Sequence, residues 1–395
     1  MKKITRRNFL IVTGAASLAA ALSACGGDSS STAAPASSGA ASAPAKPIKI
    51  GILQDITGAT SSLGKSVEAG AVAAIEELNA AGGIDGAAIE YKTYDTKGDV
   101  TEAVNSYITA VTVDNVNLII GPPVANIANA IKTTSEDYDV PVLGFALDPT
   151  CQLKEDGTPY KNMFCLQPSA TTQGAIMAAF AIKNGLKTFG IIYNQENAYS
   201  VSLLNPFIDR LAEDSITIDE KLIVPYGAAD TDYKTLLQPI VAAKVDGIYD
   251  PNYTAQLVAI ATACKELGYE GKLVCGLDAA PNFNDIYGQD CSNIYFINNI
   301  DIYESETAAI IEKVGDGVSA INKYFLGYDA IMLVKQCVET AGIENLADSV
   351  ANTKDFKCLT GTLSMDPDTH MPDGMGMFMY TYDGSKPVML EEFAG

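Results

Sequence analysis

From residue 48 onward, short apolar runs alternate with segments whose apolar side chains recur at helical spacing. The first run, residues 48–53, reads Ile-Lys-Ile-Gly-Ile-Leu and predicts a strand. Helical spacing then predicts a helix over residues 65–81, which ends before a glycine pair. The same alternation predicts strands over 89–94, 116–120 and 140–145 and helices over 100–113 and 127–138. Strands that alternate with helices of this length indicate βαβ units and a parallel sheet.

The alternation starts again after residue 165. Helices are predicted over 175–184, 203–212, 233–243 and 255–267, strands over 188–193, 247–249, 273–276 and 293–298, and an extended segment over 216–224. Two such runs predict an α/β protein with two similar doubly wound lobes, which also fits a chain too long for one hydrophobic core. Helical patterns over 307–313 and 318–335, and the Gly- and Met-rich segment 371–382, are interpreted as returns of the chain to these lobes.

The N-terminal segment has a different pattern, with basic residues, an uncharged apolar run and small residues that lead to Cys25. The apolar run, residues 9–22, is shorter than the ~20 residues that cross a bilayer as a helix, so residues 1–24 are predicted to be a signal peptide. Cys25 resembles the lipidated cysteine of bacterial lipoproteins, and Arg6-Arg7 resembles a twin-arginine export signal. Residues 25–47 hold this cysteine and a Gly-, Ser-, Ala- and Pro-rich linker, a predicted flexible tether with a reach of roughly 25 Å.

The composition is acidic. The chain has 26 Lys and Arg against 48 Asp and Glu, a formal net charge of -22. Such a surface repels nucleic acid and anionic lipid head groups, so neither is expected as a partner.

The few metal-binding and nucleophilic residues do not form a known motif. His370 is the single histidine and lies in a polar segment that predicts an exposed turn, and no Cys-x-x-Cys pair is present, so no metal site is expected. Cys151 and Cys165 flank a polar loop and are candidates for a disulfide, with buried thiols as the alternative. Hydrolase, kinase, metalloprotease and nucleotide-binding signatures are missing, so neither an enzyme nor a cofactor is expected.

The loops after the predicted strands carry residues suited to a small ligand. Open α/β sheets bind such ligands beyond the carboxyl ends of their strands. These loops hold tyrosines, hydroxyl residues and the aspartates Asp55, Asp148, Asp250 and Asp278. Aromatic rings and carboxylates together suit a ligand that has an amine and an apolar part, whereas each residue taken alone is equally consistent with a loop cap or a solvated charge.

Several motifs give the chain a likeness to a known family. The most distinctive is residues 75–86, Ile-Glu-Glu-Leu-Asn-Ala-Ala-Gly-Gly-Ile-Asp-Gly. Others are the strand 48–53 with Thr57-Gly58 and Leu63-Gly64 after it, Tyr94-Asp95, Ile119-Ile120-Gly121 and Gly327-Tyr328-Asp329-Ala330. On these residues the chain from 48 to its end resembles the type I periplasmic solute-binding proteins of ABC importers, in the leucine/isoleucine/valine-binding branch.

This resemblance implies an architecture of two Rossmann-like lobes with parallel sheets, joined by three crossover segments. The expected N-terminal lobe comprises residues 48–165 plus 299–365, and the expected C-terminal lobe residues 166–298 plus 366–395. The hinges are then expected near Leu166, Asn298 and Met365. A small ligand would lie between the lobes, which close on it by a hinge motion.

The resemblance also implies ligand-binding residues. Tyr199 and Tyr253 fall where the second lobe supplies two tyrosines, and Asp278 falls where an acid pairs with the ligand's ammonium group. Tyr328 falls where an aromatic ring lines the side-chain pocket. Ala146 falls where a backbone carbonyl accepts a hydrogen bond from the ammonium.

Other positions depart from the family. The serine and the hydroxyl residue that donate to the ligand's carboxylate fall at Ala125 and Asp148, and the tyrosine of the first loop falls at Leu63. A backbone N–H at Ala125 can still hold an anion at a helix N-terminus, but Asp148 would repel a carboxylate. The family's disulfide falls at Gly98 and Val124, so that bridge is absent. These departures weigh against a standard α-amino acid and retain an amine.

We therefore expect an extracytoplasmic, lipid-anchored substrate-binding protein of an ABC transporter. It would act as a monomer and deliver a small amine-bearing solute, a branched-chain amino acid or a related compound, to a membrane permease. The alternative is a ligand-sensing lipoprotein that signals through a membrane receptor without transport, because both activities need the same closure.

Overall fold

The computed structural model describes residues 45–279, 283–384 and 386–393. The predicted signal peptide (1–24), the lipidation site Cys25 and the linker up to residue 44 lie outside these residues. Residues 45–47, the end of the predicted linker, are exposed and lead directly into the first strand.

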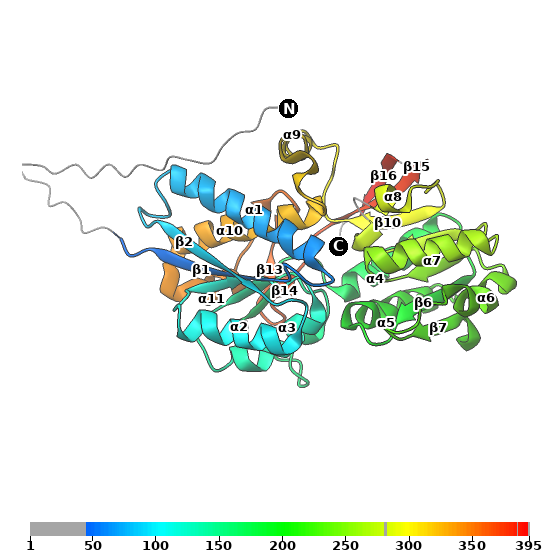
Figure 1. Cartoon of the computed structure of the whole chain (residues 1–395), viewed down its shortest axis with the longest axis horizontal. Coiled ribbons are helices and arrows are strands. Elements are labelled where there is room, and N and C mark those ends of the chain that lie inside the picture. The colour runs from blue at the N-terminus through cyan, green and yellow to red at the C-terminus, as the bar shows by residue number, and fades with distance from the viewer. Residues whose placement is uncertain (1–44, 280–282, 385, 394–395) are drawn as a thin grey trace, which may run out of the picture. The chain divides into compact units, whose positions relative to one another are not determined.

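The first sheet contains five parallel strands in the order β2-β1-β3-β4-β5. In chain order its elements are β1 (Ile48–Gln54), α1 (Ser61–Ala80), β2 (Ile89–Asp95), α2 (Val100–Thr112), β3 (Leu118–Ile120), α3 (Ala125–Ser135), β4 (Val142–Gly144) and β5 (Met163–Cys165). They run from blue to green in Figure 1. Because β1 pairs with both β2 and β3, the order of the strands reverses between β1 and β3.

The second sheet has the order β16-β15-β10-β9-β8-β6-β7. Its elements begin with α4 (Ala170–Lys183), β6 (Phe189–Asn194), α5 (Ala198–Glu213), β7 (Ile223–Tyr226), α6 (Tyr233–Ala243), β8 (Gly247–Asp250), α7 (Thr254–Glu266), β9 (Lys272–Cys275), α8 (Phe283–Tyr287) and β10 (Ile294–Asn298). The strands from β6 to β10 are parallel, and the order reverses between β6 and β8. The predicted α/β class with two sheets is confirmed.

The rest of the chain adds helices to the first part and strands to the second sheet. Its elements are α9 (Ser305–Val314), α10 (Ile321–Ala341), α11 (Leu346–Ala351), β11 (Phe356–Cys358), β12 (Gly361–Leu363), β13 (Met365–Asp366), β14 (Met371–Pro372), β15 (Met377–Asp383) and β16 (Lys386–Phe393). The β15–β16 hairpin joins the second sheet antiparallel to β10. The exact lobe boundaries and hinges stay a prediction.

Helix α10 lies directly along α1, and two glycines permit this close packing (Figure 1). A Cβ atom on Gly70 would lie 1.9 Å from the Tyr324 carbonyl oxygen, and one on Gly327 would lie 2.1 Å from the Val67 carbonyl oxygen. Any larger side chain would therefore push the two helices apart. This packing fixes the first turns of α10, which matter for the site below.

Several strands of the two sheets are buried on both faces. Every residue of β3, β4, β5 and β8 is buried, as expected for parallel strands that helices cover on both sides. The predicted helices lie within about six residues of their observed bounds, and the largest difference is at the end of α10, predicted at residue 335 and observed at Ala341. The first of them begins at Ser61 rather than at residue 65, because its first turn folds back over the end of β1, where Gly64 packs against the Asp55 backbone.

Two sequence expectations are wrong. Cys151 and Cys165 are separate buried thiols, and their sulfur atoms face the carbonyl oxygens of Ala125 and Gln167 rather than each other, so the candidate disulfide is not formed. His370 does lie in a turn, with φ 57°, but it is only 7% exposed. Its ring stacks on Phe164 of β5 at 4.3 Å, because a tertiary contact buries this locally polar segment.

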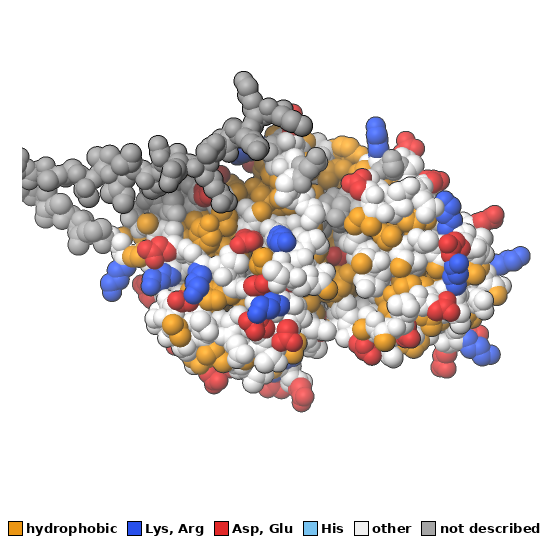
Figure 2. All heavy atoms as spheres, viewed as in Figure 1, with side chains coloured by type: hydrophobic (Ala, Val, Ile, Leu, Met, Phe, Trp, Pro, Cys, Tyr) orange, Lys and Arg blue, Asp and Glu red, His pale blue; other side chains and the backbone are white. Residues whose placement is uncertain are grey.

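The surface carries charges of both signs. Figure 2 shows acidic and basic side chains interspersed over the face in view. Among the described residues, no helix is both long enough and apolar enough to span a membrane.

Candidate functional site

The two reversals of strand order locate the candidate site. In open α/β sheets, ligands bind outside the carboxyl ends of the strands where the winding direction changes. Here those ends are the residues that follow β1 and β3 in the first sheet, and β6 and β8 in the second. The segments that leave these four strands carry Leu63, Ala125, Tyr199 and Tyr253, four of the eight residues expected to bind a ligand. Of the others, Ala146 and Asp148 follow β4 and Asp278 follows β9.

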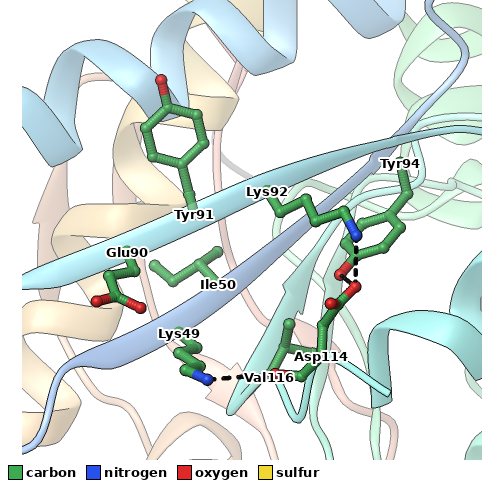
Figure 3. A pocket seen from close by; sticks show the side chains of 8 residues that line it. All are labelled: Lys49, Ile50, Glu90, Tyr91, Lys92, Tyr94, Asp114 and Val116. Atoms are coloured by element: carbon green, nitrogen blue, oxygen red, sulfur yellow. Dashed lines mark hydrogen bonds and ion pairs between the residues drawn. The ribbon is translucent and has the colours of Figure 1, made fainter. Parts of the chain in front are cut away.

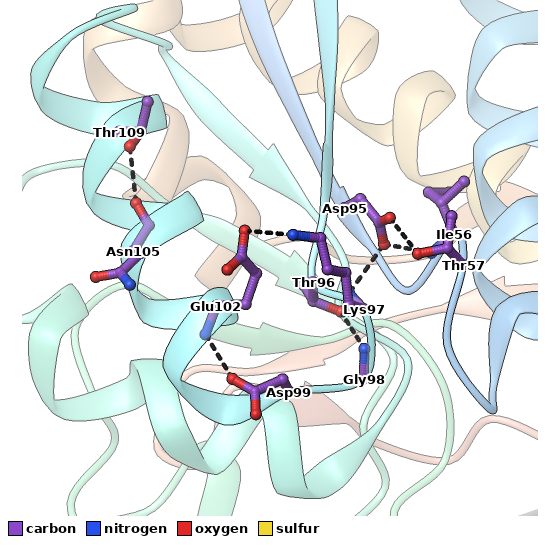
Figure 4. A network of polar contacts seen from close by, with 10 residues as sticks. All are labelled: Ile56, Thr57, Asp95, Thr96, Lys97, Gly98, Asp99, Glu102, Asn105 and Thr109. Carbon is purple, nitrogen blue, oxygen red and sulfur yellow. Dashed lines mark hydrogen bonds and ion pairs between the residues drawn. The ribbon is translucent and has the colours of Figure 1, made fainter.

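The loop after β1 is held rigidly by aspartates. Asp55 accepts hydrogen bonds from the backbone N–H groups of Gly58 and Thr60, at 2.6 and 2.9 Å. Asp95, at the end of β2, accepts from the Ile56 N–H and the Thr57 hydroxyl (Figure 4). Although burial acts against it, these hydrogen bonds hold the pKa of the Asp95 carboxyl below its usual value.

This loop leads into α1, where Leu63 occupies the first turn. Leu63 is 8% exposed, so the position of the expected tyrosine is filled by a buried aliphatic side chain. It can contribute only apolar contact to a ligand.

The loop after β3 ends at the N-terminus of α3. Ala125 is the first residue of this helix, and Val124 before it provides no side-chain cap. Ala125 and Ala146 are both 1% exposed and belong to the same large apolar cluster. Free N–H groups at a helix N-terminus favour an anion, but they carry no full positive charge.

Asp148 is occupied within its own loop. One of its oxygens accepts from the Thr150 N–H at 3.0 Å, and the other from Asn129 of α3 at 3.1 Å. It caps the short 3-10 segment Pro149–Cys151, and the residue is 7% exposed. These hydrogen bonds tie the Asp148 side chain to α3 and to its own loop.

The most distinctive group follows the second sheet. Tyr199 lies in the first turn of α5, and Tyr253 immediately precedes α7; their rings stack at 4.9 Å with an interplanar angle of 5°. Asp278, in the 3-10 segment Leu277–Ala279 after β9, is 3% exposed. Burial raises the pKa of the Asp278 carboxyl, while the charge of Lys323 and the Tyr199 hydroxyl act in the opposite direction. The structure thus brings together all three of the residues expected from the second lobe.

Buried polar contacts hold these three residues in place. The Thr254 hydroxyl donates to the Asp278 carbonyl oxygen at 2.7 Å, which links the start of α7 to the segment after β9. The Asn197 side chain caps α5 by accepting from the Tyr199 N–H at 3.0 Å. Both tyrosines are therefore positioned by backbone that is itself hydrogen-bonded.

Beneath the tyrosines lies a buried network at the end of β8. The Asn252 side chain donates to Asp250 at 2.6 Å and accepts from the Tyr226 hydroxyl at 2.7 Å and the Ser200 hydroxyl at 3.3 Å. Asp250 is fully buried, and burial raises the pKa of its carboxyl to about 7, although the bond from Asn252 lowers it. This network ties the loop that carries Tyr253 to the first turn of α5.

Sequence reasoning missed Lys323. It lies in the first turn of α10, is 5% exposed and is separated from Asp278 by 45 positions in the chain. Burial lowers the pKa of its ammonium, whereas the charges of Asp278 and Cys165 act to raise it. In the sequence, Lys323 is the only charged residue of the segment Ile-Asn-Lys-Tyr-Phe-Leu. That pattern is equally typical of a lysine on the exposed face of a helix.

Tyr328 does not join this group in the structure. Its hydroxyl donates to Glu77 near the end of α1 at 2.9 Å. Since Lys323 is one turn and a half earlier on α10, the tyrosine lies farther along the α1–α10 contact than the charged residue does.

Hydrogen bonds join loops of the two sheets next to the site. Asn126 of α3 accepts from the Ala198 N–H at 2.9 Å and donates to the Glu196 carbonyl oxygen at 3.4 Å. These bonds connect the helix after β3 with the helix after β6. Both reversal points therefore face a common region.

Another hollow lies at the opposite ends of the strands. It has a volume of about 160 Å³ and is lined by residues from the starts of β1 and β2 and by Asp114 (Figure 3). Asp114 is engaged there by Lys92 and by the Tyr94 hydroxyl, each at 2.6 Å. In the described part of the chain, no group of three or more acidic, His or Cys side chains is placed to hold a metal ion.

Comparisons with known proteins extend over both sheets. A family model described as "Periplasmic binding protein" matches residues 47–386. Over 363 residues the chain is 24% identical to the Brucella melitensis biotype 1 protein named "Leu/Ile/Val-binding protein homolog 3", which covers 89% of this chain and 96% of that relative.

Solved structures give the same result. The crystal structure of a leucine binding protein from Thermotoga maritima MSB8 matches with a TM-score of 0.77 and 25% identity, covering 88% of this chain and 99% of that one. A solute binding protein of an ABC transporter from R. palustris, in complex with 4-hydroxybenzoate, matches with a TM-score of 0.75. At 17% identity, with 88% and 97% of the two chains covered, this second likeness concerns the fold alone.

Proposed function

We propose that this chain, which belongs to the periplasmic binding protein family, is the substrate-binding protein of an ABC transporter and captures a small amine-bearing solute. The resemblance predicted from the sequence is thus confirmed. The family is one of binding proteins rather than enzymes.

The observation that carries the proposal is a buried carboxylate beside a stacked pair of tyrosines. Asp278 is 3% exposed and has no ion-pair partner within 4.0 Å among the described residues. A buried carboxylate is costly unless a cation reaches it, and aromatic rings favour a cation next to them. An ammonium group placed against Asp278 would satisfy both requirements.

The other expected site residues indicate the chemistry of the remaining part of the ligand. Leu63, Ala125 and Ala146 offer apolar surface and backbone groups, so they suit a compact aliphatic part. A branched-chain amino acid or a related compound has this composition, and relatives of the chain are named for leucine, isoleucine and valine. A micromolar dissociation constant, about -8 kcal/mol, is within reach of one buried ion pair and such packing.

The proposal includes an extracytoplasmic location and a lipid anchor. Residues 1–24 would be removed, Cys25 would carry the lipid, and the linker would leave the monomeric binding unit free to meet a permease. Two lobes with hinges near residues 166, 298 and 365 would close on the solute. Replacing Cys25 by Ser should release the protein from membranes, and membrane retention of that variant would contradict the anchor.

A ligand screen on the purified soluble part of the chain tests the proposal. Binding to the folded state raises the free energy of unfolding by about 2.7 kcal/mol at a ligand concentration 100 times Kd. We expect a rise in Tm with one or more amine-bearing solutes, tested as proteinogenic amino acids and simple aliphatic amines. Stabilisation by plain acids such as 4-hydroxybenzoate, with none by any amine, would contradict the assignment of Asp278.

A further inference from the structure

Lys323 is the one buried cation near Asp278 in the described chain, and it comes from a different part of the fold. Asp278 follows β9 of the second sheet, whereas Lys323 lies on α10, which packs along α1. The two side chains are 3% and 5% exposed. A pair of buried opposite charges at this junction needs an explanation, since each alone is costly.

The two charges influence each other without forming an ion pair. Burial lowers the pKa of the Lys323 ammonium and raises the pKa of the Asp278 carboxyl, and the charge of each group opposes the shift of the other. No ion pair at or below 4.0 Å between described residues involves either side chain. The hydrogen bonds of the described chain include the Lys323 backbone but not its ammonium.

Buried polar atoms without partners lie on the segments next to Lys323. In the described structure, Asn322 Oδ1 and both side-chain polar atoms of Asn299 have no hydrogen-bond partner. Ile300 packs against Ile321 and Phe325, which places the Asn299 segment beside the first turns of α10. The segments beside Lys323 therefore carry buried polar atoms without partners in the described structure, whereas Ala125 and Ala146 have apolar side chains.

We propose that Lys323 binds a carboxylate of the ligand, so that the site selects a zwitterion whose ammonium contacts Asp278 and whose carboxylate contacts Lys323. The inference rests on the proposed function, because it assumes that the solute lies against Asp278. Lys323 then replaces the hydroxyl donors that are missing at Ala125 and Asp148. The departures that weigh against an α-amino acid are compensated by a residue from α10.

Charge balance favours this ligand over a plain amine. In a zwitterion bound between Lys323 and Asp278, the ligand's carboxylate would face the lysine ammonium and its ammonium would face the aspartate carboxylate. Each charge then has an opposite neighbour, and the ligand adds no net charge to a buried site. A plain amine would leave the lysine without a counter-charge and would be repelled by it. The same reasoning disfavours a plain acid, which Asp278 would repel.

The test compares an amino acid with its own carboxamide. The amide retains the ammonium and the side chain but lacks the negative charge. The amino acid that raises Tm most in a screen of the proteinogenic set is titrated by calorimetry, and so is its amide, at about pH 6, below the usual α-amino pKa of about 7.7. We expect the wild-type protein to prefer the acid by about 10- to 100-fold, the range for a hydrogen bond to a charged group.

Lys323→Met should reduce this preference to about one, chiefly through weaker binding of the acid. Lys335→Met, on the same helix in a partly exposed ion pair with Glu339, is the matched control and should keep the wild-type preference. If Lys323→Met does not fold, Lys323→Gln provides the same comparison with a polar side chain.

A variant at Lys323 that keeps the wild-type preference, or a wild-type protein without preference, would overturn the assignment. Binding of plain amines with no binding of any amino acid would also overturn it, yet would leave the proposed function standing. Failure of every amine-bearing probe to bind would contradict the proposed function itself.

Discussion

Replacing Asp250 by Asn should remove a large part of the pH dependence of the protein's stability. Asp250 is fully buried at the end of β8, where it supports the loop that carries Tyr253. Burial raises the pKa of its carboxyl from 3.8 to about 7, with only the bond from Asn252 acting against the shift. One oxygen of the carboxylate has no partner among the described residues, so the ionised form is poorly solvated.

The direction in which the free energy of unfolding changes with pH follows from proton binding in the folded and unfolded states. A carboxyl whose pKa is higher in the folded chain than in the unfolded chain binds its proton more tightly when folded. The Asp250 carboxyl contributes fully to stability at a pH below its pKa in the unfolded chain. This contribution is lost as the pH rises through about 7, its pKa in the folded chain. Between about pH 5 and about pH 8, the free energy of unfolding of the wild-type protein should lose about 3 kcal/mol from this group. Asn does not titrate, so the variant should not show this loss.

Urea unfolding at these two pH values measures the effect. The wild-type protein is compared with Asp250→Asn and with Asp209→Asn, which changes an exposed carboxylate on α5. Other titrating groups, including His370, cancel in the comparison because all three proteins share them. An equal change in the free energy of unfolding for all three proteins would refute the reasoning about Asp250.

Three further predictions concern packing, closure and thiol chemistry. Gly327→Ala should lower the free energy of unfolding by about 1–3 kcal/mol in urea titrations, because the new methyl group would lie 2.1 Å from the Val67 carbonyl oxygen. Unchanged stability would show that α1 and α10 can separate freely. Asn126→Ala removes the hydrogen bonds between α3 and the loop before α5. Calorimetry should then show an affinity about 5- to 10-fold weaker than that of the wild type for the solute that stabilises the wild type. Equal affinities of the variant and the wild type would rule out a role of Asn126 in closure. Burial raises the pKa of Cys165 to about 12, so native protein should resist alkylation of this thiol until urea unfolds it, and rapid labelling of the folded protein would contradict its burial.

The regular elements of the fold could be predicted because their burial is periodic. In the helix that begins at Ser61, the buried residues Val67, Ala71 and Leu78 follow helical spacing, so the sequence pattern reflects the packing directly. The hairpin of Met377–Asp383 and Lys386–Phe393 was not recognised as two strands. Its pairing with Ile294–Asn298 joins residues about 80 positions apart, and no local pattern reports such a contact.

The candidate site could be predicted only where local chemistry and strand ends coincide. Tyr199, Tyr253 and Asp278 each follow a strand of the second sheet, so their common location follows from the topology. Tyr328 was expected in the pocket, but the direction of its side chain depends on the α1–α10 packing.

Residues buried by distant contacts were misread or missed. His370 has polar neighbours in the sequence, yet Phe164 covers its ring. Lys323 is the only charged residue in the first turn of α10, and its electrostatic interaction with Asp278 depends on the folding of segments far apart in the chain. Local sequence carries no information about either contact.

The central claim is that Asp278 binds the cationic group of a solute. It is tested most directly by titrating the solute that stabilises the wild-type protein into wild-type, Asp278→Asn and Asp209→Asn proteins in a calorimeter. We predict that Asp278→Asn weakens binding by about 10- to 100-fold, because the variant loses a charge-assisted bond in a buried site, while Asp209→Asn binds as the wild type does. Equal dissociation constants for all three proteins would contradict the account.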